Sequence, residues 1–265
     1  IHRDQFKNDT TSILKMKRVI ERGGIIAIAP AGQVSIHGNM PYINPVIVKL
    51  LKMCKADVYT LQTTGSYLAA PKWCLSKRKY PISVKCVKTL SKEEIKSFDT
   101  DTLYYKIIND LNMCDRVYQQ VANIEIKGKN LTNGLENILF ICPKCEKKYS
   151  FESINNTLKC NCCGNTVIYN KYGFLEKESD SDVILKDEAL WCEYQKHQIM
   201  GLIKANNYHF ESNVSFYSNP NKEFKLELVG RGKLIFDNDS LKYIGTYLDK
   251  KIVKEFNLKI LSQFP

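Results

Sequence analysis

The spacing of apolar residues in the first 60 positions predicts two helices and a short strand. Residues 12–22 carry apolar side chains at helical spacing on one face, and Gly23 is typical of a helix end. The apolar run at 25–28 is typical of a strand. A second helix is predicted to open at Asn44-Pro45, because proline is favoured at the start of a helix. Its expected buried positions are Val46, Ile47, Leu50, Leu51 and Cys54.

Strand-like and helical segments continue to alternate up to about residue 120. The stretch 58–63 and the alternating residues of 82–86 are predicted strands. Residues 92–120 are predicted to be helical, beginning with a capping box between Ser91 and Glu94. Strands separated by helices predict an α/β fold with right-handed crossovers, in which a mixed sheet is flanked by helices.

The rest of the chain divides into a cysteine-rich ribbon and a β-rich tail. A polar connector leads into the ribbon, and a helix is predicted at 188–205. From Tyr208 onward, short alternating segments with Asn, Asp and Gly turns predict a small antiparallel, barrel-like sheet. We therefore expect an α/β domain at 1–125, a zinc ribbon at 138–175, and a helix plus a small β domain at 186–265.

The positive charge of the chain is concentrated in its first third. The net charge is +11, and residues 1–98 hold 17 Lys/Arg against 6 Asp/Glu, whereas residues 99–265 hold 22 of each. Such asymmetry indicates an anionic partner, namely a phospholipid surface, a phosphorylated substrate or nucleic acid. The alternative is a set of solvated lysine-rich faces. A hydrophobic content of 44 % excludes global disorder, and no apolar run is long enough to span a bilayer.

Four cysteines in the middle of the chain have the spacing of a zinc ribbon. Cys142 and Cys145 bracket two residues, as do Cys160 and Cys163, and fourteen residues separate the pairs. Two such knuckles can present four thiolates to one structural Zn²⁺ ion. Two disulfides, or buried thiols in a β-rich segment, are the alternatives, and Cys162 competes with Cys163 as the fourth ligand. Ten cysteines in a chain of this length indicate a reducing compartment.

A possible anion site follows the predicted strand at 25–28. The chain passes through Pro30 and Gly32 to Ser35, so a turn would present backbone N–H groups and a hydroxyl at a sheet edge. A tight turn without a ligand is the alternative reading of the same residues.

Three blocks follow one another between residues 1 and 73. They are Ile1-His2-Arg3-Asp4; Ala29-Pro30-Ala31-Gly32-Gln33-Val34-Ser35; and Val58-Tyr59-Thr60-Leu61-Gln62-Thr63-Thr64-Gly65 with Tyr67 and Pro71-Lys72-Trp73. In order, spacing and strand/helix setting, these blocks resemble those of the glycerolipid acyltransferase family, the 1-acyl-sn-glycerol-3-phosphate acyltransferases. The resemblance covers roughly residues 1–120.

The resemblance implies transfer of a fatty acyl group from acyl-CoA or acyl carrier protein to a lysophosphatidic-acid-like acceptor. The family's catalytic His-x4-Asp pair would lie before Ile1, so no catalytic residue is expected within the 265 residues. This sequence departs from the family at Ala31, Val34 and Tyr59, where the family has glutamate, arginine and proline. The substrate-binding residues that the resemblance implies are Arg3, Pro30, Gly32, Ser35 and Gly38.

Two other functions remain open from the sequence. One is a catalytically degenerate homologue that binds a lipid or a protein. The other is a nucleic-acid-binding zinc ribbon protein, which the near-balanced charge of the ribbon disfavours. For the acyltransferase we expect a cytoplasmic protein bound peripherally to the anionic inner face of the cell membrane. Lys77-Arg78-Lys79 is expected to be a solvated turn or a lipid headgroup contact, with Trp73 and Tyr80 as interfacial aromatics.

Overall fold

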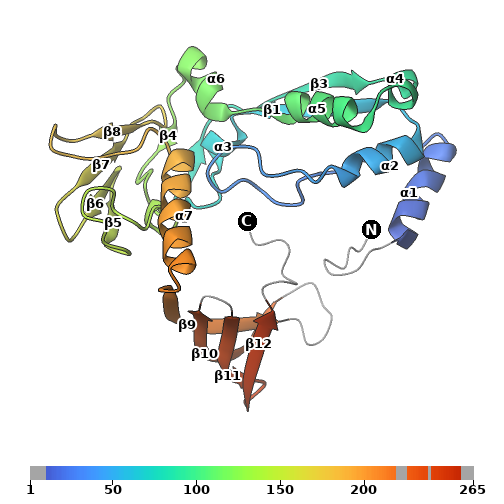
Figure 1. Ribbon diagram of the computed structural model, residues 1–265. Coiled ribbons are helices and arrows are strands. Elements are labelled where there is room, and N and C mark those ends of the chain that lie inside the picture. Colours follow the sequence, from blue (N-terminus) through green and yellow to red (C-terminus); the bar gives the residue numbers. More distant parts are fainter. Residues whose placement is uncertain (1–9, 219–225, 238–239, 258–265) are drawn as a thin grey trace. The chain divides into compact units, whose positions relative to one another are not determined.

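The computed structural model describes residues 10–218, 226–237 and 240–257 (Figure 1). The chain divides into two compact units, Ile1–Cys192 and Glu193–Pro265, each of which is described by itself. The first block of the resemblance, including Arg3, lies outside the described residues. The elements are several antiparallel sheets with helices between them, so the coarse α/β class is confirmed.

Both helices predicted in the first 60 residues are present. Helix α1 spans Thr10–Glu21, and α2 spans Val46–Cys54 with Pro45 at its N-cap. Helix α2 ends where Lys55 takes a left-handed conformation and donates its backbone N–H to the Leu51 carbonyl. The buried position of α2 is Val48 rather than the exposed Val46, so the expected stripe is rotated by part of a turn.

The strand prediction at 25–28 is wrong. Within the described residues this segment has no regular secondary structure and no sheet partner, and Ile25 and Ile28 are exposed to solvent. An apolar run forms a strand only where a neighbouring strand can satisfy its backbone N–H and C=O groups.

The expected right-handed crossover is also wrong, because the first two long strands pair antiparallel. Strand β1 (Val58–Thr64) pairs with β3 (Ser83–Leu90), with Leu61 opposite Cys86. The connection between them holds only the single-turn helix α3 (Ser66–Ala69) and the short strand β2 (Arg78–Lys79), which pairs with β4 (Lys127–Gly128). The chain therefore returns beside β1 in the opposite direction, without a crossover.

Helices cover one face of the β1–β3 pair, as Figure 1 shows for α5. The predicted helical stretch 92–120 is divided into α4 (Lys92–Ser97), α5 (Thr100–Leu111) and α6 (Asp115–Ala122). The capping box of Ser91 and Glu94 is present at the start of α4. The hydrophobic core under these helices consists of Val48, Leu90, Ile95, Leu103 and Ile107.

The cysteine-rich segment folds as a four-stranded antiparallel sheet within the first unit. Its strands are β5 (Phe151–Ile154), β6 (Thr157–Cys160), β7 (Thr166–Tyr169) and β8 (Leu175–Lys177), in that order. A 3-10 turn, η1 (Leu135–Asn137), precedes them. The side chains of Leu139, Leu158 and Val167 are fully buried, so the segment contains apolar packing of its own.

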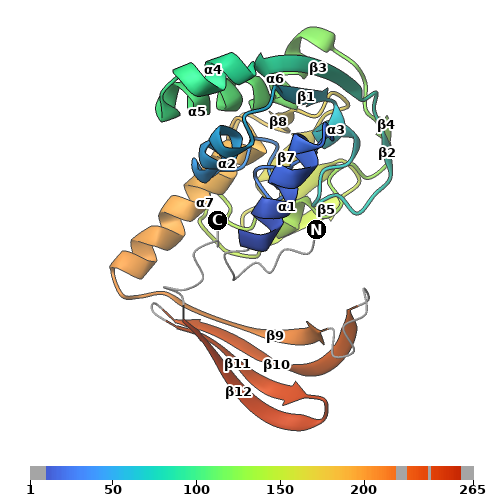
Figure 2. The same cartoon turned by 90° about the vertical axis from the view of Figure 1, so that its right-hand side faces the viewer.

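The tail forms an antiparallel four-stranded sheet, as expected. Helix α7 (Glu188–Lys204) leads to β9 (His209–Ser218), β10 (Glu227–Asp237), β11 (Ser240–Tyr247) and β12 (Lys250–Asn257), and the sheet is strongly curved (Figure 2). Aromatic contacts among Phe216, Tyr243 and Tyr247 form part of one face. In the described strand order β9 and β12 are the two edges, so the closed, barrel-like form stays a prediction.

None of the helices in the described part of the chain is both long enough and apolar enough to cross a membrane.

The core between the helices and the β1–β3 pair should dominate the stability of the first unit. Leu90→Ala is expected to lower the free energy of unfolding by about 2–5 kcal/mol, because Leu90 is completely buried. Leu61→Ala removes the same atoms from a side chain that is 62 % exposed. It should change the free energy of unfolding by less than about 0.5 kcal/mol. Urea unfolding followed by circular dichroism measures both, and equal losses would contradict the assignment of the core.

Candidate metal centre and substrate loop

Two loops of the same local geometry carry the four spaced cysteines. In the first, the N–H of Glu146 donates to the Cys142 carbonyl at 2.8 Å, and the N–H of Cys142 donates to Lys147. In the second, Gly164 N–H donates to the Cys160 carbonyl at 2.9 Å. Glu146 and Gly164 both have a positive φ, which turns the chain back on itself. The C-x2-C spacing therefore folds into two equivalent knuckles.

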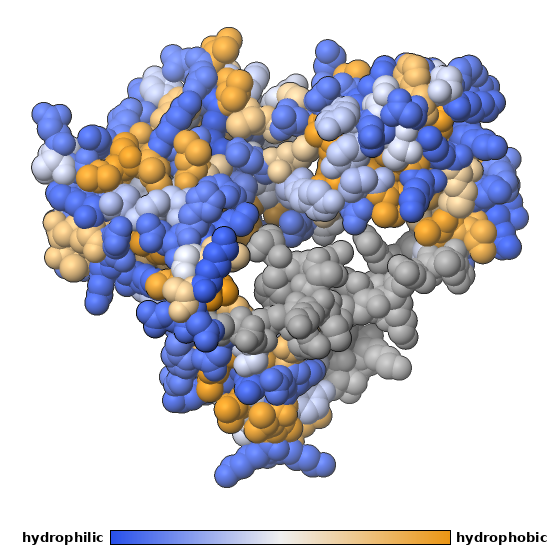
Figure 3. Space-filling view, in the orientation of Figure 1, coloured by the Kyte–Doolittle hydropathy of each residue, from blue (hydrophilic) through white to orange (hydrophobic). Residues whose placement is uncertain are grey.

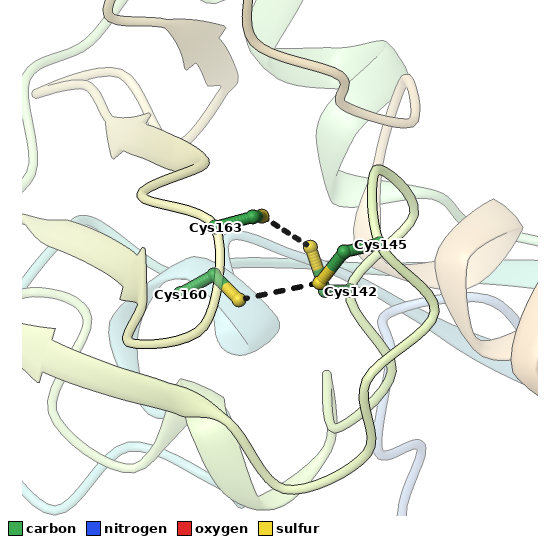
Figure 4. A group of neighbouring side chains, drawn as sticks. All are labelled: Cys142, Cys145, Cys160 and Cys163. Atoms are coloured by element: carbon green, nitrogen blue, oxygen red, sulfur yellow. Dashed lines mark hydrogen bonds between the residues drawn. The ribbon is translucent and has the colours of Figure 1, made fainter.

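The knuckles bring the four thiols together, as Figure 4 shows. The sulfurs of Cys142 and Cys163 lie 3.7 Å apart, and those of Cys145 and Cys160 lie 3.8 Å apart. All four ligand atoms lie within 4.8 Å of one another. Zn–S bonds of about 2.3 Å in a tetrahedron would place the sulfurs about 3.8 Å apart. The cluster therefore has the dimensions of a four-thiolate metal site.

The two-disulfide alternative is wrong. All ten cysteines are free thiols, and the sulfurs in the cluster are far beyond the roughly 2.05 Å of a disulfide bond. Of the two neighbouring candidates for the fourth ligand, Cys163 belongs to the cluster, whereas Cys162 is exposed and lies outside this set. The cluster therefore contains the cysteine that the C-x2-C spacing favours as the fourth ligand.

The surroundings of the cluster affect its thiols in opposite directions. Burial raises the pKa of the Cys142 thiol above its ordinary value. Burial acts the same way on Cys160, but hydrogen bonds with the Ser150 hydroxyl and with the N–H groups of Cys163 and Cys162 outweigh it and lower the pKa of Cys160 to about 6. A metal that binds all four sulfurs must displace the protons of the remaining thiols.

Aromatic packing from α7 supports the first knuckle. The indole N–H of Trp191, a fully buried side chain, donates to the Ile141 carbonyl at 3.0 Å, one residue before Cys142. The Trp191 ring also meets Phe151 of β5 edge-on, with ring centroids 5.7 Å apart. The knuckle is therefore held in place by the fold as well as by its own hydrogen bonds.

The second candidate site is the loop around residues 29–38. The N–H of Gly32 donates to the Ala29 carbonyl at 3.1 Å, forming the turn that contains Pro30. The Ser35 hydroxyl accepts a hydrogen bond from the Gly38 N–H at 2.8 Å. The turn and the hydroxyl are thus present, but they lie in a loop rather than at the edge of a sheet.

Gly38 brings this loop against the third block of the resemblance. Its φ is +86°, and a Cβ atom at this position would lie 2.9 Å from the Tyr67 ring and 2.6 Å from Nη1 of Arg116. Only a glycine can adopt this backbone conformation so close to both side chains. Gly38, three residues after the second block, therefore lies against Tyr67, which belongs to the third block.

A buried ion pair behind the loop was not predicted from the sequence. Arg116 donates to the His37 carbonyl at 2.6 Å and to the Asn39 side chain at 2.5 Å. Its guanidinium also lies 3.4 Å from Glu188 and 3.8 Å from Asp187. The side chains of Arg116 and Glu188 are 8 % and 1 % exposed. This pair joins residues 72 positions apart, so no local sequence pattern could indicate it.

Tyr67 extends the same network. The indole N–H of Trp73 donates to the Tyr67 hydroxyl at 3.0 Å, and that hydroxyl donates to Glu188 at 3.4 Å. Burial raises the pKa of the Glu188 carboxyl, an effect that the positive charge of Arg116 opposes. The network therefore contains a buried carboxylate whose charged form Arg116 stabilises.

Asp115 fixes the start of α3. Its carboxylate accepts hydrogen bonds from the backbone N–H groups of Gly65 and Tyr67, each at 2.7 Å. Gly65 has a φ of +85°, and a Cβ atom there would lie 2.1 Å from the Pro81 carbonyl oxygen. The glycine that ends the third block is thus required by the close approach of another backbone segment.

The expected headgroup contact at 77–79 is wrong in part. Trp73 and Tyr80 are buried, so neither is an interfacial aromatic. The guanidinium of Arg78 lies 4.7 Å from the centre of the Trp73 ring and 5.0 Å from that of Tyr169. Arg78 therefore joins this segment to the cysteine-rich sheet rather than standing in solvent.

Comparisons of the chain with protein-family models, with curated proteins and with solved structures give no match.

Replacing one knuckle cysteine should abolish metal binding, whereas replacing its neighbour should not. Cys163→Ala leaves three thiols, and the purified protein is expected to contain little zinc and to lose protection of its amide hydrogens in β5–β8. Cys162→Ala is the matched control, since the two cysteines are adjacent in the chain. Elemental analysis and hydrogen exchange measure the two effects. Loss of zinc in both variants, or in neither, would contradict the proposed ligand set.

Removing the cation of the buried pair should destabilise the first unit in a pH-dependent way. Arg116→Met leaves Glu188 buried without its partner and should lower the free energy of unfolding by about 3–5 kcal/mol at neutral pH. When the pKa of a carboxyl is higher in the folded state than in the unfolded state, the folded protein loses stability as the pH rises from the unfolded pKa to the folded pKa. Since the loss of Arg116 raises the pKa of Glu188 further, the deficit should be smaller at about pH 5 than at neutral pH.

The control is the double variant R116M/E188M, which removes both charges and should recover part of the lost stability. Denaturant titrations at the two pH values measure the difference. A deficit that is the same at both values, with no recovery in the double variant, would contradict an ion pair between these residues.

Proposed function

We propose that the protein is an acyltransferase of the glycerolipid type, which moves a fatty acyl group from a thioester donor to a lysophosphatidic-acid-like acceptor. The observation that supports the proposal is the close approach of Gly38, three residues after the second block, to Tyr67 of the third block. The proposal includes an acyltransferase-like fold, that is, a larger mixed sheet flanked by helices.

In the proposed reaction, a hydroxyl of the acceptor attacks the thioester carbonyl. The new C–O bond forms as the C–S bond breaks, and the proton of the hydroxyl leaves with the thiol product through a base. That base would be the family's His-x4-Asp pair, expected before Ile1. The described residues would bind the acceptor phosphate instead, through the Gly32 turn and the Ser35 hydroxyl. Arg3 would bind the same phosphate.

The metal in the cysteine cluster is proposed to be structural zinc. Thiolates are ligands that Zn²⁺ prefers, and four of them fill its tetrahedral coordination. No open position would then remain for a substrate or a water molecule, which separates the cluster from the chemistry of acyl transfer.

The partners follow from the same proposal. They are acyl-CoA or acyl carrier protein as donor, a lysophospholipid as acceptor, and the anionic cytoplasmic face of the cell membrane, where the protein would be peripherally bound. The excess of positive charge in residues 1–98 favours these anionic partners.

A catalytically degenerate lipid- or protein-binding homologue is the second candidate. Ala31 and Val34 favour it, because neither side chain can bind phosphate where the family has glutamate and arginine. In this case the loop would hold its ligand through the backbone and Ser35 alone.

The complete gene product should acylate lysophosphatidate when it is supplied with acyl-CoA or acyl carrier protein. Ser35→Ala removes a hydroxyl from the proposed phosphate site and should raise the KM for lysophosphatidate by about tenfold, as expected for a hydrogen bond to a charged group. Ser215→Ala, in β9 of the other unit, is the control and should leave KM unchanged. The assay follows transfer of a labelled acyl chain.

Binding of lysophosphatidate without turnover, with every donor tested, would favour the degenerate homologue. If the protein neither binds nor acylates lysophosphatidate, both candidates are rejected.

A further inference from the structure

One face of the β1–β3 pair is apolar and exposed. In the described part of the chain α5 covers the opposite face, where Gln62 donates to the Asp110 carbonyl of α5 at 2.9 Å. The uncovered side, which we call the open sheet face, carries Tyr59, Leu61, Val84 and Cys86. Tyr59, Leu61 and Val84 are 57 %, 62 % and 60 % exposed. Clusters of large exposed apolar side chains usually mark an interaction surface.

The alternation of the two strands places these residues together. Leu61 lies opposite Cys86 in the register, and Val84 lies opposite Thr63, on the same side as Leu61. Residues directly opposite in an antiparallel pair have neighbouring side chains. Cys86 is exposed for the same reason.

The strands and loop around this face carry only positive charge. Residues 58–92 contain seven Lys/Arg and no Asp/Glu. Six of the seven are exposed lysines; Lys72, Lys77 and Lys79 lie in the connection between β1 and β3, whereas Lys85, opposite Gln62, lies on the face that α5 covers. Lys88, next in the row after Cys86, pairs with Asp57 at 2.8 Å and lies 6.0 Å from the centre of the Tyr59 ring.

Further apolar residues reach the surface beside the start of β3. Tyr80 donates a hydrogen bond to Gln119, which places α6 next to this end of the strand. Helix α6 buries Asp115, Arg116 and Gln119 and turns Val117 and Val121 outward. Figure 3 shows apolar side chains at the surface over α6, at the top of the view.

We propose that the open sheet face is the surface by which the protein docks on an anionic bilayer. Apolar side chains with an aromatic among them would enter the interface, while the surrounding lysines would meet the anionic headgroups. The inference rests on the proposed function in that an enzyme acting on lysophospholipids needs such a contact. The residues proposed to enter the membrane interface are therefore Tyr59, Leu61 and Val84. Trp73 and Tyr80 have no part in it, because they are buried.

The test is co-sedimentation of the complete gene product with vesicles of phosphatidylcholine that contain or lack phosphatidylglycerol. The unchanged protein should bind the anionic vesicles and bind the neutral ones weakly. Val84→Glu should lower its partition coefficient by at least about tenfold, because a charge replaces an apolar group in the interface. Val253→Glu makes the same change at a valine in β12 that is 70 % exposed, and should leave binding unchanged.

A second variant, Cys86→Glu, keeps the test independent of the folding of Val84→Glu. It places a negative charge at an exposed residue of the open sheet face, directly opposite Leu61, and should weaken binding to anionic vesicles without changing the denaturant midpoint. The inference is overturned if the variants in the open sheet face and Val253→Glu bind equally well, or if binding is the same without phosphatidylglycerol. Salt-sensitive binding of RNA that these variants abolish, with vesicle binding intact, would overturn it in favour of nucleic acid.

Because vesicle binding requires no turnover, each of the two proposals can be rejected without the other. Acyl transfer by a protein whose vesicle binding does not depend on Val84 would reject only the docking surface. Vesicle binding through Val84, without acyl transfer, would reject only the enzyme.

Discussion

The buried pair of Arg116 and Glu188 is the interaction on which the arrangement of the first unit depends. One guanidinium binds the backbone of the 37–39 loop, while the carboxylate it faces belongs to α7 and also meets Tyr67. Four segments distant in the sequence, the 37–39 loop, α3, α6 and α7, are therefore joined through one pair of charges. A buried ion pair adds little net stability over apolar packing, but it strongly penalises any structure that separates the two charges. Its effect here is to specify one position for the loop.

The cluster of four cysteines is a second constraint on the first unit, and it acts on a different part of it. The knuckles tie the 141–148 hairpin to the β6–β7 turn, and Trp191 connects the first knuckle to the helix that carries Glu188. Arg78, between the rings of Trp73 and Tyr169, connects the same sheet to the segment that follows α3. The cysteine-rich sheet is thus packed against the segment that follows α3, and a metal bound by the four thiols would stabilise that packing.

The features that depend on local spacing could be predicted from the sequence. The helices α1 and α2, the strands β1 and β3, the capping box at Ser91 and the four thiols of the cluster all follow from patterns within about twenty residues. Pairing between distant segments could not be predicted. An alternating run does not specify whether its partner is parallel or antiparallel, and the apolar run at 25–28 has no partner in the described residues.

Burial of single residues was also beyond local patterns. Trp73 and Tyr80 seemed suited to a lipid interface because lysines surround them, yet both are buried, whereas Tyr59 on β1 is exposed. The candidate loop is a mixed case: its turn at Gly32 and its Ser35 hydroxyl were predicted, whereas the Arg116 network that positions it was not. Glycine supplied an unused signal, since Gly38 and Gly65 both sit where no larger residue fits.

The central claim is that the Gly32–Gly38 loop binds the phosphate of a lysophospholipid. A crystal structure of the complete gene product with lysophosphatidate tests it most directly. The account predicts the phosphate oxygens within hydrogen-bonding distance of the Ser35 hydroxyl and of the backbone N–H groups of the Gly32 turn. A phosphate held elsewhere, with the loop unchanged and without contact to the ligand, would contradict it.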